Sequence, residues 1–132
     1  MLHAMLDTNV CIRVLRDKPK AARERFKSEA GSLGISTVVL YELHYGAAKS
    51  QRPDFHREEL AAFASRLIVL PFDDLAADHA GGIKADLHRR GQVIGPNDLL
   101  IAGHARSLGL KLITGNLKEF TSVEGLRCED WL

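Results

Sequence analysis

The chain has 132 residues, of which 45% are hydrophobic and 27% charged, a composition that indicates one soluble globular domain rather than a disordered protein. No apolar run approaches the roughly 20 residues that span a bilayer, and the first residues lack the basic flank and apolar core of a secretory signal. The formal net charge of +1 identifies no partner, and two cysteines are too few for a disulfide framework, so we expect a reduced, cytoplasmic environment and no membrane contact.

Short apolar runs that are typical of strands recur along the chain and alternate with segments of helical spacing. These runs are "HAML" at 3–6, "LGIS" at 33–36, "LIVLPF" at 67–72, "LKLIT" at 110–114 and a weaker "LRCEDW" at 126–131. Alternating strands and helices predict an α/β fold with a mainly parallel sheet, as a single domain over residues 1–132. In such sheets, ligands bind just beyond the carboxyl ends of the strands.

Two of the intervening segments carry clear helix signals. The segment "GPNDLLIAGHARSLGL" predicts a helix that begins near Pro96 and ends near Gly109. In another segment, apolar residues step by three or four positions along one face: Ala76, Ala80, Ile83 and Leu87.

The segment from residue 13 to residue 27 has a local excess of positive charge. It contains only two acids, against seven basic residues: Arg13, Arg16, Lys18, Lys20, Arg23, Arg25 and Lys27. This excess is compatible with binding to a phosphate backbone, and equally with a solvated helix face.

Three acids interrupt apolar patterns. Asp7 directly follows the first strand-like run, in "MLDTNV". Glu42 lies at helical spacing from Val39 and Tyr45, and Asp98 has apolar neighbours at the same spacing, so both are expected on apolar stripes. Desolvating a carboxylate costs several kcal/mol unless something compensates.

Each of these acids alone has a structural explanation. Asp7 is suited to cap a helix, and Glu42 to lie in water at the edge of a stripe or to pair with an arginine. Asp98 is suited to the first turn of a helix, where the helix dipole favours an acid. Convergence on one cleft at the strand ends explains all three together. Two carboxylates about 6 Å apart repel by roughly 3 kcal/mol at an effective dielectric constant of about 20. Such a cluster therefore requires protons, a basic group or a cation, and Mg²⁺ prefers oxygen ligands.

A fourth polar group follows the strand-like run at 110–114. Thr114 and Asn116 come at its carboxyl end, and Glu119 follows three residues later. The alternative is a turn closed by Gly115 and Asn116, with Glu119 in solvent.

The order of these motifs resembles that of the PIN-domain ribonucleases, and among them the VapC-type toxins of bacterial toxin–antitoxin pairs, most closely the enteric type. The resemblance covers essentially the whole chain and rests on "MLDTNV", "ISTVVLYELHYGAAKS", "IGPNDLLIAGHARSLGLKLITGN", and "EF" before "EDW". It implies a three-layer α/β/α sandwich with a sheet of four or five strands. It also implies an acidic site that binds Mg²⁺ or Mn²⁺.

The resemblance assigns roles to individual residues. Asp7, Glu42 and Asp98 match the three core catalytic acids, with Asp7 and Asp98 as metal ligands. Glu119 matches a fourth catalytic acid. Asn116 stands where many members have aspartate, which favours one firmly bound ion over two. The polar residues expected to support the acids are Thr8, Asn9, Thr114 and Asn116.

The resemblance also implies a reaction and partners. The reaction is endonucleolytic cleavage of structured RNA that leaves a 5′-phosphate and a 3′-hydroxyl. For the enteric type, the substrate is initiator tRNA, cut in its anticodon stem-loop. The implied partners are a second copy of the chain and a small VapB-type antitoxin that inserts a segment, often with an arginine, into the acidic cleft. DNA is contacted only through the antitoxin.

Two other functions are compatible with parts of the sequence. A receiver-type regulatory domain also binds Mg²⁺, and Asp73 and Asp74 follow a strand-like run, but the first run ends in the single Asp7 and the second in Ser36. These paired acids are better explained as the start of a helix. A non-catalytic PIN-like scaffold that binds RNA or protein is the other alternative, favoured by Asn116 and opposed by the three core acids.

Overall fold

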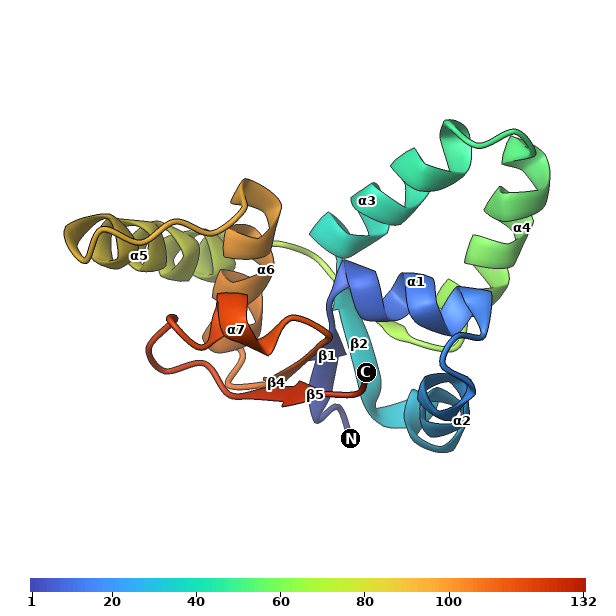
Figure 1. Ribbon diagram of the computed structural model, residues 1–132, viewed down its shortest axis with the longest axis horizontal. Helices are drawn as coiled ribbons and strands as arrows, with labels where there is room; N and C mark the ends of the chain where they lie inside the picture. Colours follow the sequence, from blue (N-terminus) through green and yellow to red (C-terminus); the bar gives the residue numbers. More distant parts are fainter.

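The computed structural model describes residues 1–132 and consists of a five-stranded sheet between two layers of helices (Figure 1). The strand order is β3-β2-β1-β4-β5, and every neighbouring pair is parallel. The predicted α/β sandwich is therefore confirmed, with five strands. Each strand lies within one of the predicted apolar runs: β1 (Ala4–Leu6), β2 (Leu33–Ser36), β3 (Ile68–Leu70), β4 (Lys111–Thr114) and β5 (Cys128–Asp130).

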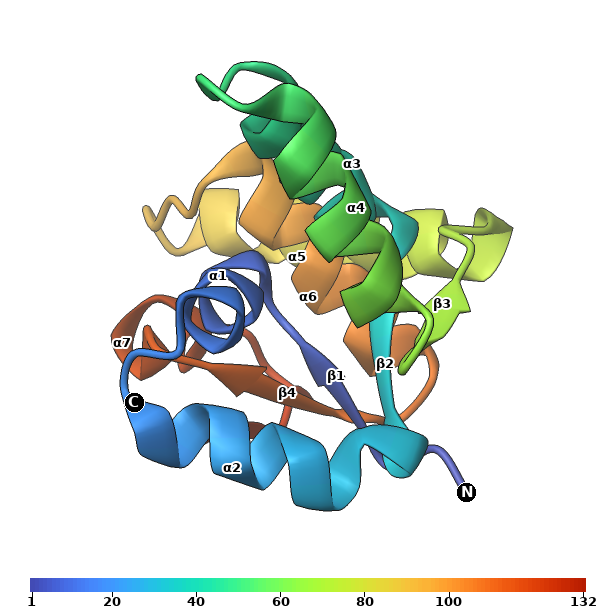
Figure 2. The same ribbon diagram turned by 90° about the vertical axis from the view of Figure 1, so that its right-hand side faces the viewer.

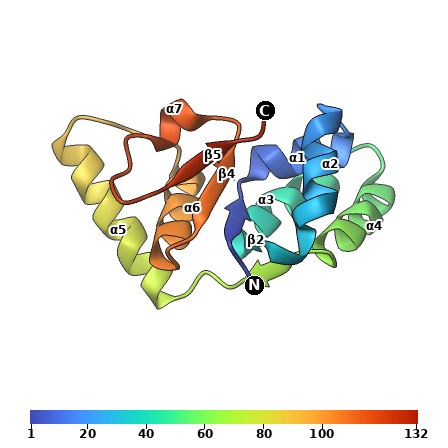
Figure 3. The ribbon, with the colours of Figure 1, turned by 90° about the horizontal axis from the view of Figure 1, so that it is seen from below.

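Helices connect the strands and cover both faces of the sheet. Figure 3 shows α5 and α6 on one side of the sheet and α1, α2 and α4 on the other. No helix is long and apolar enough to cross a membrane. The helices are α1 (Thr8–Arg16), α2 (Lys20–Glu29), the 3₁₀ turn η1 (Ala30–Ser32), α3 (Thr37–Ala48), α4 (Pro53–Ala64), α5 (Asp74–Arg89), α6 (Pro96–Ser107) and α7 (Leu117–Phe120).

The central strands form the middle of the core because both of their faces are covered. Every residue of β1 and of β2 is buried, and three of the four residues of β4 are buried. Strands buried on both faces have continuous rather than alternating apolar sequences, which is why short unbroken runs predicted them correctly. The edge strands β3 and β5 are more exposed.

The helix predicted around Ala76 and Ala80 is α5, and its four predicted face residues are its four buried residues. Asp73 caps this helix, since its side chain accepts a hydrogen bond from the Ala76 N–H at 2.9 Å. Asp74 is the first residue of α5. The paired acids therefore open a helix, as expected, and the receiver alternative loses its motif.

Helices α5 and α6 pack against each other where both carry small residues. A Cβ added to Gly103 of α6 would lie 2.6 Å from the Cα and from the backbone nitrogen of Ala80 on α5. Real Cβ atoms do not approach backbone so closely, so only glycine fits at this crossing. The contact fixes the orientation of α6, which carries Asp98 in its first turn.

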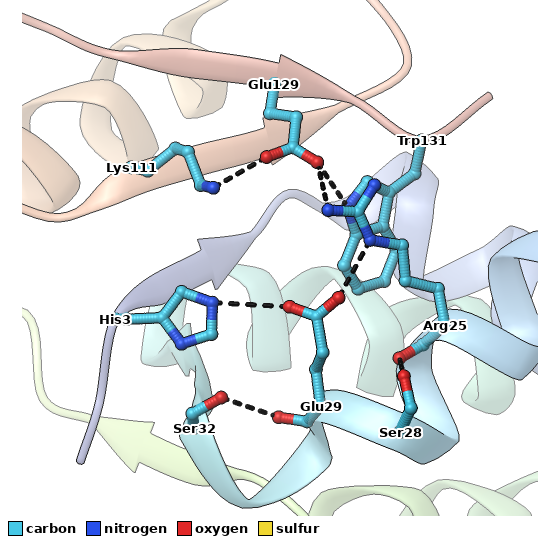
Figure 4. A network of polar contacts seen from close by, with 8 residues as sticks. All are labelled: His3, Arg25, Ser28, Glu29, Ser32, Lys111, Glu129 and Trp131. Carbon is cyan, nitrogen blue, oxygen red and sulfur yellow. Dashed lines mark hydrogen bonds and ion pairs between the residues drawn. The ribbon is translucent and has the colours of Figure 1, made fainter.

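A polar network ties α2 to the edge of the sheet (Figure 4). Glu129 on β5 pairs with Lys111 on β4 at 2.6 Å and with Arg25 on α2. Arg25 also pairs with Glu29 at 2.8 Å and lies over the ring of Trp131, 5.0 Å from its centroid. Part of the basic segment at residues 13–27 therefore has a structural role within the chain.

Candidate active site

The candidate site lies at the switch point of the sheet. The chain leaves β1 towards β2 and β3 on one side, and later returns to place β4 and β5 on the other side. The crevice between the carboxyl ends of β1 and β4 is where α/β sheets of this kind bind ligands. Asp7 follows β1 and Thr114 ends β4, and the Thr114 Oγ1 donates a hydrogen bond to Asp7 Oδ2 at 2.5 Å.

Asp7 combines two of the roles that the sequence left open. Its Oδ1 accepts a hydrogen bond from the Val10 N–H at 2.9 Å, so it caps α1. Its side chain is only 4% exposed. Burial raises the pKa of Asp7, repulsion from Glu42 and Glu119 raises it further, and the hydrogen bonds from Thr114 and Val10 oppose these effects. Asp7 is thus a cap that also belongs to an acidic cluster.

Glu42 lies at the edge of the buried stripe of α3, rather than within it. The buried residues of this helix are Val39, Leu43 and Ala47, whereas Tyr45 is 60% exposed. The expectation that Tyr45 continues an apolar stripe through Glu42 is therefore wrong, because the buried face of α3 is narrower than the sequence indicated. The Glu42 carboxylate is held from both sides, although not by a basic residue. Its partners are Thr8 Oγ1, which donates to Oε1 at 2.5 Å, and Asn97 Nδ2, which donates to Oε2 at 3.3 Å.

Asp98 and Glu119 form a pair of carboxyls beside Gly95. A Cβ on Gly95 would lie 3.4 Å from Asp98 Oδ2 and 3.8 Å from Glu119 Oε1. The Gly95 N–H donates to Glu119 Oε1 at 2.9 Å, and Asn116 Nδ2 donates to Glu119 Oε2 at 2.8 Å. Burial raises the pKa of Asp98 to about 7, with further contributions from the charge of Glu119, from a hydrogen bond between the two carboxyls, and from Asp7 and Glu42.

The four predicted acids therefore converge, although they come from four separate segments. The charges of Asp7, Glu42 and Glu119 all raise the pKa of Asp98, and none of the four acids forms an ion pair with lysine, arginine or histidine. In the positions that the side chains take here, no three acidic, histidine or cysteine groups form a ready metal-ligand set. The donors are nevertheless all carboxylate oxygens without a cationic partner, which is the chemistry that a hard divalent cation requires.

The predicted supporting residues have different outcomes. Thr8, Thr114 and Asn116 each donate a hydrogen bond to one of the acids. Asn9 is exposed and makes no hydrogen bond with them, and its side-chain amide lies beside Gly115 instead.

Sequence reasoning missed two donors: the side chain of Asn97 and the backbone N–H of Gly95. Both belong to "GPND", directly before Asp98. The signal available is this clustering of Gly, Pro and Asn at the helix start, which helix initiation alone also explains.

An open cavity of about 580 Å³ begins at this site. Thr8, Glu42 and Asn97 line it next to the acids, and from there it extends between α1, α3 and α4. Figures 1 and 2 show how these three helices are arranged. The cavity gives a ligand room to reach the acidic cluster along α3.

Comparison with known proteins agrees with this geometry. The family model described as PIN domain matches residues 4–126. The chain is 51% identical over 131 residues to the tRNA(fMet)-specific endonuclease VapC of Shigella flexneri, and 48% identical over 131 residues to the protein of that name in Salmonella typhimurium. In both cases the match covers 99% of each chain.

Solved structures give the same result. The structure of DNA-bound VapBC from Salmonella typhimurium matches with a TM-score of 0.96 and 48% identity, over 100% of both chains. The structure of VapBC2 from Rickettsia felis, bound to a DNA fragment from its promoter, matches with a TM-score of 0.92 and 34% identity, again over 100% of both chains. The resemblance expected from the sequence is confirmed: the chain belongs to the PIN-domain family and, within it, to the VapC proteins.

Proposed function

We propose that this protein is a metal-dependent endoribonuclease and the toxin of a toxin–antitoxin pair. The observation that carries the proposal is the convergence of Asp7, Glu42, Asp98 and Glu119 at the switch point without a basic partner. Such a cluster is unfavourable unless it binds protons or a cation. Clusters of acids with raised pKa values are typical of functional sites, where cation binding offsets their repulsion.

The cation proposed is Mg²⁺ or Mn²⁺, held by Asp7 and Asp98. When bound, such an ion stabilises the charge that develops on a phosphate and lowers the pKa of water. Asn116 supplies a neutral amide rather than a carboxylate near Glu119, which favours one ion over two.

The remaining residues act through the positions that the fold gives them. Glu42 is held by Thr8 and Asn97, which suits it to orient a water molecule against phosphorus. Glu119 lies at the rim and is held by Gly95 and Asn116. Attack by water releases a 5′-phosphate and a 3′-hydroxyl, whereas attack by the ribose 2′-hydroxyl would give cyclic ends.

The substrate proposed is initiator tRNA, cut in its anticodon stem-loop, because two relatives that match along 99% of their length are named tRNA(fMet)-specific endonucleases. The partners proposed are a second copy of the chain and a VapB-type antitoxin, through which DNA would be contacted. Two solved neighbours are VapBC assemblies with DNA, which supports this. An arginine from the antitoxin would suit the acidic cluster, since guanidinium pairs well with carboxylates. The proposed compartment is the cytoplasm.

Cleavage of initiator tRNA by the purified protein tests the proposal. We expect cleavage in Mg²⁺ that EDTA abolishes, with 5′-phosphate and 3′-hydroxyl ends. Asp98→Ala should lower the rate on the order of 100-fold or more, because it removes a group that stabilises charge in the transition state. The matched control is Asp78→Ala, which changes an exposed acid on α5.

Cleavage that persists in EDTA, or cyclic 2′,3′-phosphate ends, would contradict the mechanism. RNA binding without cleavage, unchanged by Asp7→Asn, would favour the non-catalytic scaffold.

A further inference from the structure

We propose that an exposed stripe of α3 binds unpaired RNA bases beside the scissile phosphodiester. The stripe consists of Tyr41, Tyr45 and Lys49 and is called the tyrosine stripe here. The inference rests on the proposed function, because it concerns how RNA would reach the four acids.

The two tyrosines are exposed to an unusual degree for large aromatic residues. Tyr41 is 62% exposed and Tyr45 is 60% exposed. They are four residues apart, as are Tyr45 and Lys49, so all three lie on one face of α3. Neither ring contributes to the core, whose contacts on this helix come from Val39, Leu43 and Ala47. An exposed aromatic pair outside the core indicates a surface for a partner.

The tyrosine stripe leads to the acidic site. Tyr41, Tyr45 and Lys49 all line the cavity of about 580 Å³, which Glu42 and Thr8 also line. From residue 41 to residue 49 the stripe extends about 12 Å, at 1.5 Å of rise per residue. An occupant that lies along the stripe therefore reaches Glu42, the one of the four acids that lines this cavity.

The charge of this cavity beyond the acids suits a phosphate backbone. Arg16 and Lys49 line it, and neither pairs with an acid of the chain. The Lys49 Nζ lies 4.7 Å from the centroid of the Tyr45 ring, so a base stacked on that ring has a cation beside it. His56 and Glu59 also line the cavity, and the His56 Nδ1 lies 3.0 Å from the Glu59 Oε1.

Unpaired nucleotides satisfy all of these features at once. Proteins bind single-stranded RNA by stacking its bases on aromatic side chains while cations follow the backbone. Paired bases within a helix are not available for such stacking. The geometry therefore assigns a loop rather than a stem to the tyrosine stripe, with the loop continuing towards the acids. A protein segment is the competing occupant.

The test compares variants in cleavage of a synthetic stem-loop RNA that the wild-type protein cuts. We expect Tyr41→Ala and Tyr45→Ala each to raise KM about tenfold, since base stacking on one aromatic ring contributes roughly 1–3 kcal/mol, and to change kcat less than threefold. Tyr41→Phe and Tyr45→Phe keep the rings and should retain the wild-type KM. Leu75→Ala removes an equally exposed side chain from α5 and serves as the control.

Salt dependence tests the cation separately. We expect Lys49→Met to weaken the dependence of log KM on log salt concentration by about one unit of slope, as loss of one phosphate contact would. Lys84→Met, at an exposed position of α5, should leave the slope unchanged.

Two results would overturn the inference. One is an unchanged KM in tyrosine-to-alanine variants whose circular dichroism is that of the wild type. The other is normal cleavage by these variants together with loss of inhibition by the antitoxin, which would assign the stripe to a protein segment. Fluorescence anisotropy of a labelled oligoribonucleotide with Asp98→Ala protein separates this inference from the proposed function. The alanine changes should weaken that binding about tenfold even if the wild-type protein cleaves no RNA, and no such change would count against the stripe alone.

Discussion

Asp98 shows how the acidic cluster is stabilised without a cation. Its carboxyl is half-buried, and its pKa of about 7 follows first from that burial and then from Glu119. At neutral pH a proton is therefore shared among groups that would otherwise repel one another. A cation that binds there has to displace this proton, so affinity for Mg²⁺ should increase as the pH rises.

This ionisation also makes stability depend on pH. In EDTA, we expect the free energy of unfolding to fall as pH rises from about 4 to about 7. The unfolded Asp98 carboxyl loses its proton near its ordinary value of 3.8, whereas the folded one retains it until about 7. Above pH 7 both forms are ionised, and this contribution to the slope disappears.

Urea denaturation between pH 4.5 and pH 8 measures this effect. Asp98→Asn should give a shallower pH dependence than the wild type, with a residual slope of the same sign from Asp7, whose pKa is also raised. Asp78→Asn is the control and should keep the full slope. Equal slopes for Asp98→Asn and the wild type would show that Asp98 ionises normally.

At the level of single residues, the sequence predicted the acids better than their surroundings. Asp7, Glu42 and Asp98 could be selected because a carboxylate next to apolar residues has a high desolvation cost. That Tyr45 is exposed could not be predicted, since helical spacing alone does not say how wide the buried face is. Asn97 and Gly95 gave no signal because their hydrogen bonds join segments whose approach depends on the whole fold.

Among the helices, the packing of α5 against α6 depends on a single glycine. Gly103 brings the two backbones together at Ala80, and α6 carries Asp98 at its other end. The position of one acidic ligand is thus determined by a contact more than one helical turn away.

Gly103→Ala should therefore be strongly destabilising. The added methyl group would overlap backbone atoms of Ala80, which no rotamer change relieves, so we expect a loss of about 3 kcal/mol in the free energy of unfolding. Gly81→Ala on α5 is the matched control. A Cβ there meets nothing within 4 Å, and we expect it to stabilise by about 0.5–1 kcal/mol. Urea denaturation measures the free energy of unfolding of both variants. Similar free energies for the two would show that the contact between α5 and α6 tolerates a side chain at position 103.

Helices could be predicted where a buried face makes apolar residues repeat at helical spacing. The buried face of α5 was predicted because four of its apolar residues repeat at helical spacing. Helix α4 was not predicted as a separate element, since only Leu60 and Phe63 are buried in an otherwise polar segment. Its position depends on packing against α3, and a sequence period does not report such contacts.

For the molecule as a whole, the network around Glu129 joins the last strand to the helical layer (Figure 4). The hydrogen bond from Lys111 lowers the pKa of Glu129, and the charges of Lys111 and Arg25 add to this effect. The side chains of the network are partly exposed, so solvent screens the ion pairs.

Glu129→Gln should lower the free energy of unfolding by about 1–2 kcal/mol, because it removes the negative charge that pairs with both Lys111 and Arg25. The difference should become smaller in 1 M NaCl, where screening weakens the pairs. Thermal and urea denaturation at low and high salt measure it. Glu58→Gln, at an exposed position of α4 without an ion pair, is the control. A difference independent of salt would indicate that Glu129 acts through packing.

The order of the strands in the sheet could not be predicted from local sequence patterns. The apolar runs predicted five strands and the alternation predicted a parallel sheet, but no period in the sequence says that β1 lies between β2 and β4. That order depends on how the connecting helices pack, and no local pattern reports such contacts.

The placement of the acids on both sides of the switch point has a consequence for biosynthesis. Asp7 leaves the ribosome early, whereas β4 and Glu119 are translated long afterwards, and the crevice needs both. An N-terminal fragment that stops before β4 lacks Thr114, the partner of Asp7, and one of the four carboxylates. Premature termination or proteolytic loss of this region would therefore yield a chain without the complete acidic cluster, and any activity that needs all four acids begins only when synthesis is nearly finished.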